Sequence, residues 1–328
     1  MTTGEQSAAI TPTERWERFW FAPASTATLE VFRVAYGIVL FLWTLAIAPN
    51  ALTFFSSDGI LPKHPPTGTR WGPLSWWGSN AAVVAVVVLL LAAAACIAAG
   101  YRTRPACVVA FVGLIALTRR NPFMFNSGDA LLRNIALFMT VAPSGVSLSV
   151  EALGRGRDAF WRIASRAPWA LRLVQVQISM VYLFTGWAKA RGDRWIAGTA
   201  VGESLRVGDI ARFHLPYGFS NSLLRVTLLT FGTLAVELSL ALLIWNRRLR
   251  PWVIAAGIAL HLFIELVFAL GFFSVVMITS YIAFVPEDAM ERWLAGVRAR
   301  MRRSRLAPLR RLAEGADAKS GDLSAATN

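Results

Sequence analysis

Long apolar runs alternate with short polar or basic clusters along most of the chain. A helix needs about 20 mainly apolar residues to cross a hydrocarbon layer of about 30 Å. The pattern therefore predicts an all-α polytopic membrane protein with about eight spans, of which the third, fourth and eighth are short. The expected spans are residues 29–48, 79–100, 105–118, 130–143, 170–189, 222–245, 251–270 and 272–286.

The segment before the first span has a different pattern. Thr11 can serve as a helix N-cap, with Pro12 at the first helical position and Glu14 at the third. Aromatic residues then alternate with charged ones, which is typical of an amphipathic helix lying in the membrane interface. We expect three parts: a disordered start and interfacial helix in residues 1–28, a transmembrane domain in 29–287 and a basic tail in 288–328.

The charges refine this picture. Only 16% of the residues are charged, whereas a soluble domain carries about 25%. If the N-terminus is inside, the inner segments hold 21 Lys and Arg residues and the outer segments hold nine. This bias predicts that both termini are cytoplasmic in an integral cell-membrane protein. The net charge of +14 is then explained by a tail facing anionic lipid, and no nucleic-acid partner is expected.

The cysteines and histidines do not suggest a metal centre. Cys96 and Cys107 flank a short turn without CxxC spacing, and we expect them to be packing residues. Two of the three histidines, His64 and His214, fall in predicted outer loops. No HxxxH or HxxE pattern occurs. We therefore expect no bound metal.

Ionisable residues inside the apolar spans are the most informative side chains. Each costs about 2.5–3.5 kcal/mol at a helix centre on insertion scales, so it usually faces protein, water or a partner. Their depth predicts an outer group and, separately, a structural ion pair between Arg33 and Glu237 in the inner half. The residues of the outer group and those nearer the middle are Asp129, Arg133, Lys189, His261 and Glu265.

Lys189 ends a polar stripe on the fifth span. Gln175, Ser179, Tyr182, Gly186 and Lys189 follow one another at steps of three or four, so they share one helix face. Such a face either packs against another helix or lines a cavity. Lys189 is accordingly either a snorkelling anchor at a helix end or a residue held in a site.

His261 and Glu265 stand four residues apart on one face of the seventh span. They can form an internal hydrogen bond that holds a helix pair together. They can also form a proton-handling pair, because histidine titrates near neutrality and a carboxylate can fix its tautomer.

Several segments together resemble the horizontally transferred transmembrane (HTTM) domain, which is related to the membrane part of vitamin K-dependent gamma-carboxylase. The resemblance covers about residues 14–287. The segments that carry it are Ser56-Ser-Asp-Gly-Ile-Leu-Pro62, Arg120-Asn-Pro-Phe-Met-Phe-Asn-Ser-Gly-Asp-Ala-Leu-Leu-Arg133, Tyr182-Leu-Phe-Thr-Gly-Trp-Ala-Lys189 with Trp195 and Gly198-Thr-Ala200, Val236-Glu-Leu238, and His261 with Leu270-Gly-Phe-Phe-Ser-Val-Val-Met277.

The resemblance implies a chemistry for these residues. In the carboxylase, a lysine after a short Gly-x-x motif is the base that deprotonates reduced vitamin K, and Lys189 matches that position. The resemblance thus implies Lys189 as a catalytic base, matches His261 to a family histidine, and implies a reduced quinone of the vitamin K or menaquinone type as cofactor. Glu265, four residues after His261 on the same helix face, would assist it. The expected cavity residues are Asn126, Asp129, Arg133, Ser179 and Tyr182.

Two functional classes follow. The first is a membrane enzyme that uses a reduced quinone or modifies a lipid or peptide, with Lys189 in an outer-leaflet cavity. The second is a non-catalytic membrane protein that binds lipid or peptide and assists export or maturation of a secreted peptide. Compared with the carboxylase, the Asn-Ser-Gly-Asp segment lacks a histidine, and a short basic tail replaces a large lumenal region.

Overall fold

The computed structural model describes residues 10–61, 72–213, 216, 218 and 222–303. The residues predicted as a disordered start, most of the basic tail, His64 and His214 lie outside this described part. The chain divides into two units, Met1–Phe284 and Val285–Asn328, which are treated separately.

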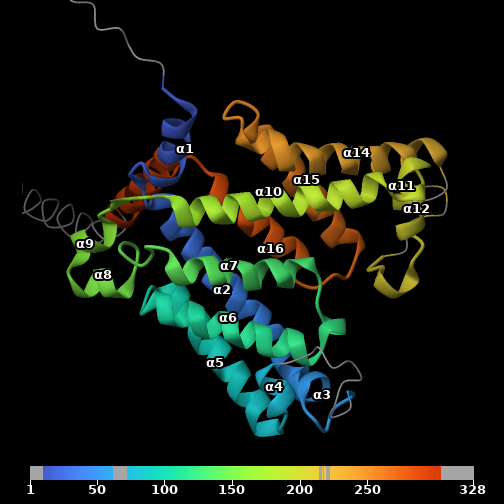
Figure 1. Cartoon of the computed structure of the whole chain (residues 1–328), viewed down its shortest axis with the longest axis horizontal. Coiled ribbons are helices and arrows are strands. Elements are labelled where there is room, and N and C mark those ends of the chain that lie inside the picture. Colours follow the sequence, from blue (N-terminus) through green and yellow to red (C-terminus); the bar gives the residue numbers. More distant parts are fainter. Residues whose placement is uncertain (1–9, 62–71, 214–215, 217, 219–221, 304–328) are drawn as a thin grey trace, which may run out of the picture. The chain divides into compact units, whose positions relative to one another are not determined.

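Nearly every labelled element is helical, as the apolar pattern predicts (Figure 1). The helices are α1 (Pro12–Phe21), α2 (Ala27–Ile47), α3 (Ala51–Phe55), α4 (Pro73–Trp76), α5 (Asn80–Ala99), α6 (Thr103–Arg120), α7 (Ser127–Val141), α8 (Val150–Gly154), α9 (Arg157–Trp161), α10 (Trp169–Ala190), α11 (Asp193–Ile196), α12 (Ala200–Ser204), α14 (Leu223–Leu242), α15 (Arg250–Val267) and α16 (Phe273–Ser280). Short 3₁₀ turns are η1 (Ala48–Asn50), η2 (Pro122–Met124), η3 (Gly208–Ile210), η4 (Leu243–Trp245) and η5 (Tyr281–Phe284). The strands β1 (Ala24–Ser25) and β2 (Ser165–Arg166) form one short antiparallel pair.

Four helical segments of the described part are long and apolar enough to cross a membrane. They are Ala27–Phe55, Asn80–Ala99, Leu223–Trp245 and Arg250–Val267. A fifth is added if Phe273–Phe284 and Glu287–Arg303 form one broken span. The remaining predicted spans coincide with α6, α7 and α10, which do not meet the same criteria. The protein is therefore an all-α membrane protein, and the number of eight spans stays a prediction.

The N-terminal helix α1 begins as its sequence predicts. Thr11 Oγ1 accepts a hydrogen bond from the Glu14 backbone nitrogen at 3.2 Å, and Glu14 Oε2 accepts one from the Thr11 nitrogen at 2.9 Å. This reciprocal capping box satisfies two donors that would otherwise lack a partner. The exposed Trp16 and Phe21 side chains are compatible with the predicted interfacial position.

Two groups of helices make up the first unit (Figure 1). Helices α2, α5, α6 and α7 pack in one group, and α10, α14 and α15 pack in the other. Helix α16 contacts α2 and α7 as well as α15, so it joins the groups. The α2–α5 contact is very close, because a Cβ at Gly37 would lie 2.4 Å from the Ala98 nitrogen. A small residue is therefore required at this crossing.

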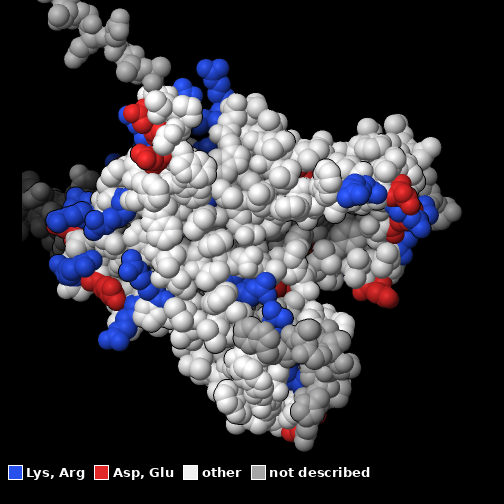
Figure 2. Space-filling model, viewed as in Figure 1, with Lys and Arg blue, Asp and Glu red and all other residues white. Residues whose placement is uncertain are grey.

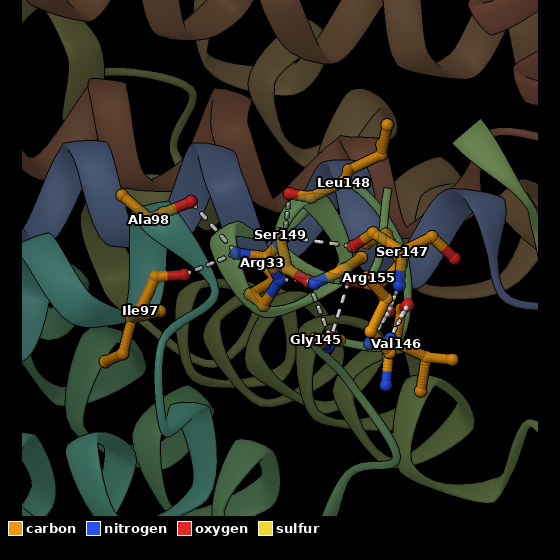
Figure 3. A network of polar contacts seen from close by, with 11 residues as sticks. Arg33, Ile97, Ala98, Gly145, Val146, Ser147, Leu148, Ser149 and Arg155 are labelled. Carbon is orange, nitrogen blue, oxygen red and sulfur yellow. Dashed lines mark hydrogen bonds and ion pairs between the residues drawn. The ribbon is translucent and has the colours of Figure 1, made fainter. Parts of the chain in front are cut away.

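A buried ion pair ties the first group to the segment before α8. Figure 3 shows its Arg33 side chain between Ile97 and Ala98 on one side and Leu148 on the other. Glu30 and Arg33 of α2 are 3.0 Å apart and fully buried. The guanidinium donates to the carbonyl oxygens of Ile97 at 2.6 Å and Leu148 at 2.7 Å, among others. Glu30 accepts hydrogen bonds from backbone nitrogens, including that of Gly145 at 3.0 Å.

The predicted Arg33–Glu237 ion pair is therefore wrong. Arg33 is neutralised within its own helix by Glu30, three residues earlier. It also satisfies carbonyl groups at the end of α5, which have no partner inside that helix. Gly100, with φ +71°, ends α5 there. The sequence indicates the observed partner of Arg33 through the three-residue spacing between Glu30 and Arg33. The depth of Arg33 in the predicted span does not reveal this partner.

The second unit contains a helix over Glu287–Arg303. Asp288 and Arg292 form an ion pair of 2.8 Å across one helical turn, and both side chains are exposed. The hydrogen bond with Arg292 lowers the pKa of the Asp288 carboxyl.

Candidate ligand cavity

A cavity of about 810 Å³ lies among α10, α14, α15 and α16. Its wall is mainly apolar, with Phe263, Ile264 and Phe273 among the larger side chains. The molecular surface over α10 and α14 that Figure 2 shows is also largely uncharged. Charged side chains gather at its two ends, over α8 and α9 at one end and over α11 and α12 at the other. Such a cavity suits an apolar or amphiphilic ligand.

Lys189 lies on the cavity wall in the last turn of α10. Its Nζ forms an ion pair with Glu237 of α14 and lies 4.8 Å from the centre of the Trp195 ring. The chain turns at Gly192 after α10 ends, and α11 then brings Trp195 back over the lysine. The Lys189 side chain is 27% exposed and that of Glu237 is 9% exposed. The Lys189 side chain is therefore fixed by Glu237 and Trp195 and does not extend freely into solvent.

The pairing of Lys189 with Glu237 has a structural cause. Helix α12 packs against the first turns of α14: the Val201 nitrogen donates to Thr230 Oγ1 at 3.2 Å. A Cβ at Gly202 would lie 2.7 Å from Val226 Cγ1. The beginning of α14 therefore extends past the end of α10, and Glu237 comes level with Lys189. The apolar pattern predicts a deeper position for Glu237 because it implies that the sixth span begins at the level where the fifth span ends.

A second polar group on the wall is built from three helical segments. The Tyr182 hydroxyl is hydrogen-bonded to His261 Nε2 at 2.8 Å and to the Tyr281 hydroxyl. Gly257 leaves room for Tyr281, because a Cβ there would lie 2.7 Å from its hydroxyl oxygen. Tyr281 was not predicted, although the polar sequence Thr-Ser-Tyr inside an apolar segment was an available signal.

Two buried polar atoms of this cavity have no hydrogen-bond partner among the described residues. They are His261 Nδ1 and Glu237 Oε2. Buried polar groups are normally hydrogen-bonded, since leaving one unpaired costs about 1–3 kcal/mol. Both residues line the cavity. The two atoms are themselves covered, so a side-chain rotation would be needed for a polar ligand or water to supply the missing partners.

Glu265 does not join His261 in the cavity. It instead forms an ion pair with Arg212 at 2.7 Å. The same segment is fixed to the end of α15 by a hydrogen bond from the Arg212 nitrogen to the Val267 carbonyl at 2.8 Å. Ile210 and Phe268, next to these contacts, line the cavity. The expected His261–Glu265 pair is therefore not formed, and Glu265 holds a segment at the edge of the cavity.

The polar stripe of α10 has a divided role. Tyr182 and Lys189 line the cavity. Ser179 instead accepts a hydrogen bond from Trp245 Nε1 at 2.9 Å, and Gln175 Nε2 donates to the Ala283 carbonyl at 2.6 Å. The inner part of the stripe thus packs against other helices. The prediction that Ser179 lines the cavity is therefore wrong.

The other predicted cavity residues also lie elsewhere. Asn126 and Arg133 line a separate cavity of about 260 Å³. Asp129 is buried, and its carboxylate accepts hydrogen bonds from Trp43 Nε1 at 2.6 Å and from the Asn126 nitrogen at 2.8 Å. Asp129 therefore caps α7 and fixes α2 instead of facing a ligand.

Outside the cavity, charged and metal-binding residue types are paired or apart from one another. Arg194 of α11 pairs with Glu203 of α12, and this hydrogen bond lowers the pKa of the Glu203 carboxyl. Cys96 is half-buried and Cys107 is buried, both as free thiols. Within the described ranges, no group of three His, Cys, Asp or Glu residues is arranged to hold a metal ion.

Comparison with known proteins gives one match. The family model described as the HTTM domain matches residues 21–289. No curated protein and no solved structure matches the chain. The matched region contains every helix that forms the cavity, and the apolar helices are those of a membrane protein. The resemblance seen in the sequence is thus confirmed, and the chain belongs to the HTTM domain family, whose members are membrane proteins related to gamma-carboxylase.

Proposed function

We propose that the protein binds an amphiphilic molecule of the reduced-quinone type in the 810 Å³ cavity and that Lys189 accepts a proton from its polar group. One observation carries this proposal. Lys189, Glu237 and His261 face an otherwise largely apolar cavity. Titratable groups that converge on a concave, mainly apolar site are typical of sites that transfer protons.

The residues present fit such a molecule. The apolar wall suits a ring and a hydrocarbon tail. Glu237 Oε2 and His261 Nδ1 lack partners among the described residues. After a side-chain rotation, Glu237 Oε2 can accept from a hydroxyl group and His261 Nδ1 can bind a hydroxyl or carbonyl group. When bound, a reduced quinone would supply reducing equivalents and an ionisable hydroxyl group. Glu237 and His261 would hold its polar end.

The side chains of the protein provide the proton path. Lys189 Nζ and the Glu237 carboxylate are in direct contact, so a proton can move from the ammonium to the carboxylate. Once that proton has moved, the neutral amine of Lys189 can accept another proton from the ligand. The bond from Tyr182 to His261 Nε2 fixes the imidazole, and Nδ1 has no partner among the described residues. His261 is thereby positioned to exchange a second proton.

A binding role without catalysis is the alternative. The Lys189–Glu237 ion pair can equally serve as a structural contact that joins α10 to α14. In that case, the cavity would hold a lipid or the apolar part of a peptide during export or maturation. The two roles differ in whether Lys189 must lose its proton.

Mass spectrometry of lipids and quinones extracted from the purified full chain tests the proposed ligand. We expect about one amphiphilic molecule per protein. Gly232 lines the cavity, and a Cβ added to it would meet no described atom within 4 Å, so Gly232→Leu should fill space and lower the bound amount several-fold. Gly154 has equally open surroundings but does not line this cavity, so Gly154→Leu is the matched control. Equal amounts in all three proteins would exclude the cavity as the binding site.

We also propose the orientation with both termini cytoplasmic and the basic tail on anionic lipid. Single cysteines should be introduced after replacement of Cys96 and Cys107. Positions Asp58 and Gly218 should react with a membrane-impermeant reagent in intact cells. Positions Gly154 and Ser320, the latter outside the described residues, should react only after permeabilisation. Labelling of the Gly154 position in intact cells would contradict the eight-span arrangement.

A further inference from the structure

The second cavity lies where α6 ends and α7 begins. Its volume is about 260 Å³, and its polar wall is formed by Thr118, Arg119, Asn126 and Arg133. Asn126 also donates from Nδ2 to the Leu270 carbonyl at 3.1 Å. Leu270 lines the larger cavity, so this contact stands between the two cavities.

Arg133 carries a positive charge that the described residues do not neutralise. Asp129 is one turn earlier on α7, the usual position for an ion pair. Both of its oxygens are already engaged, one by Trp43 Nε1 at 2.6 Å and the other by the Asn126 nitrogen at 2.8 Å. The structure thus places an arginine in the second turn of α7, a predicted span, while its nearest carboxylate in sequence has other partners. A charged residue within a span usually faces protein, water or a ligand, because it costs about 2.5–3.5 kcal/mol at a helix centre.

An exposed apolar strip extends from the two arginines. Leu137 and Val141 follow Arg133 on one face of α7 and are 43% and 48% exposed. Val108 and Val112 are likewise exposed on the face of α6 that ends at Arg119. Helices α6 and α7 are consecutive and pack together (Figure 1). The surface is therefore cationic at one end and apolar along its length.

We propose that this cavity binds the phosphate of an anionic phospholipid whose acyl chains lie along α6 and α7. The guanidinium group has a planar arrangement of donors that matches phosphate oxygens. Asn126 has a second amide hydrogen available beside the one given to Leu270. Two arginines in one small cavity favour a head group with net negative charge. The site is distinct from the proposed quinone cavity and does not depend on it.

Native mass spectrometry of the full chain in detergent tests this site, with phosphatidylglycerol and phosphatidylcholine as probes. Phosphatidylglycerol should bind more tightly. Arg133→Gln and Arg119→Gln should each weaken its binding about tenfold, the effect of losing one charge-assisted hydrogen bond. Arg248→Gln removes an exposed arginine from a turn outside this cavity and should change nothing. Arg119 is itself exposed, so its variant should fold even if that of Arg133 does not.

The other outcomes each overturn the proposal. Equal losses with Arg248→Gln would show only general charge attraction. Equal affinity for the two lipids in wild type and variants would remove the head group as the recognised feature. Displacement of the lipid by millimolar inorganic phosphate would assign the cavity to a free anion instead.

Discussion

Glu30→Ala and Arg33→Ala are each expected to destabilise the protein by about 3–5 kcal/mol, the usual cost of removing one partner from a buried ion pair. The reason is the extent of the network around these side chains. Glu30 accepts from the backbone nitrogens of Gly145, Val146 and Ser147, at 3.0, 2.9 and 3.3 Å. The alanine variant leaves these donors and the Arg33 guanidinium without their acceptor. We expect a large loss of folded protein, measured by size-exclusion yield and thermal melting in detergent.

A matched pair provides the control. Asp288 and Arg292 are also separated by about one helical turn but are exposed. Asp288→Ala should therefore leave the melting temperature nearly unchanged, because exposed ion pairs contribute little to stability. The double variant Glu30→Ala/Arg33→Ala should cost less than the sum of the single variants, because each single change leaves the other charge uncompensated. Additive losses would show that the two side chains do not stabilise one another.

The network explains why part of the structure could not be predicted. The helices follow from the apolar pattern, and the capping box of α1 follows from the spacing of Thr11 and Glu14. The acceptors and donors around Arg33 and Glu30 are backbone groups of Ile97, Leu148 and Gly145. Every residue carries such groups, so no side-chain pattern in the sequence marks these contacts.

The candidate cavity shows a second limit. The helical spacing placed Tyr182 and Lys189 on one face, and both line the cavity. Their partners depend on how far each helix extends past its neighbour. The packing of α12 on α14 brings Glu237 to Lys189. The backbone contact of Arg212 with Val267, at the end of α15, brings Arg212 to Glu265. Apolar periodicity locates a helix and its faces, but it does not fix the level at which two helices meet.

Lys189→Arg is expected to preserve folding and abolish function, whereas Lys189→Ala should impair both. Arginine keeps the charge and can still pair with Glu237, so the melting temperature should change little. It cannot act as a base, because its guanidinium stays protonated at any working pH. Alanine leaves Glu237, whose side chain is only 9% exposed, without its counter-charge. Complementation of a chromosomal deletion, together with melting in detergent, would measure the two effects separately.

Glu237 variants complete this test, because they remove the carboxylate that is proposed to receive the proton of Lys189. Glu237→Ala should destabilise by about 3 kcal/mol or less, the lower part of the range for a broken buried pair, since Lys189 is 27% exposed. Lys189→Ala/Glu237→Ala should be more stable than the sum of the single losses predicts. Restored stability without restored complementation would separate the proton-transfer role from the structural one. If Lys189→Arg complements like the wild type, the base mechanism is wrong and the cavity serves binding alone.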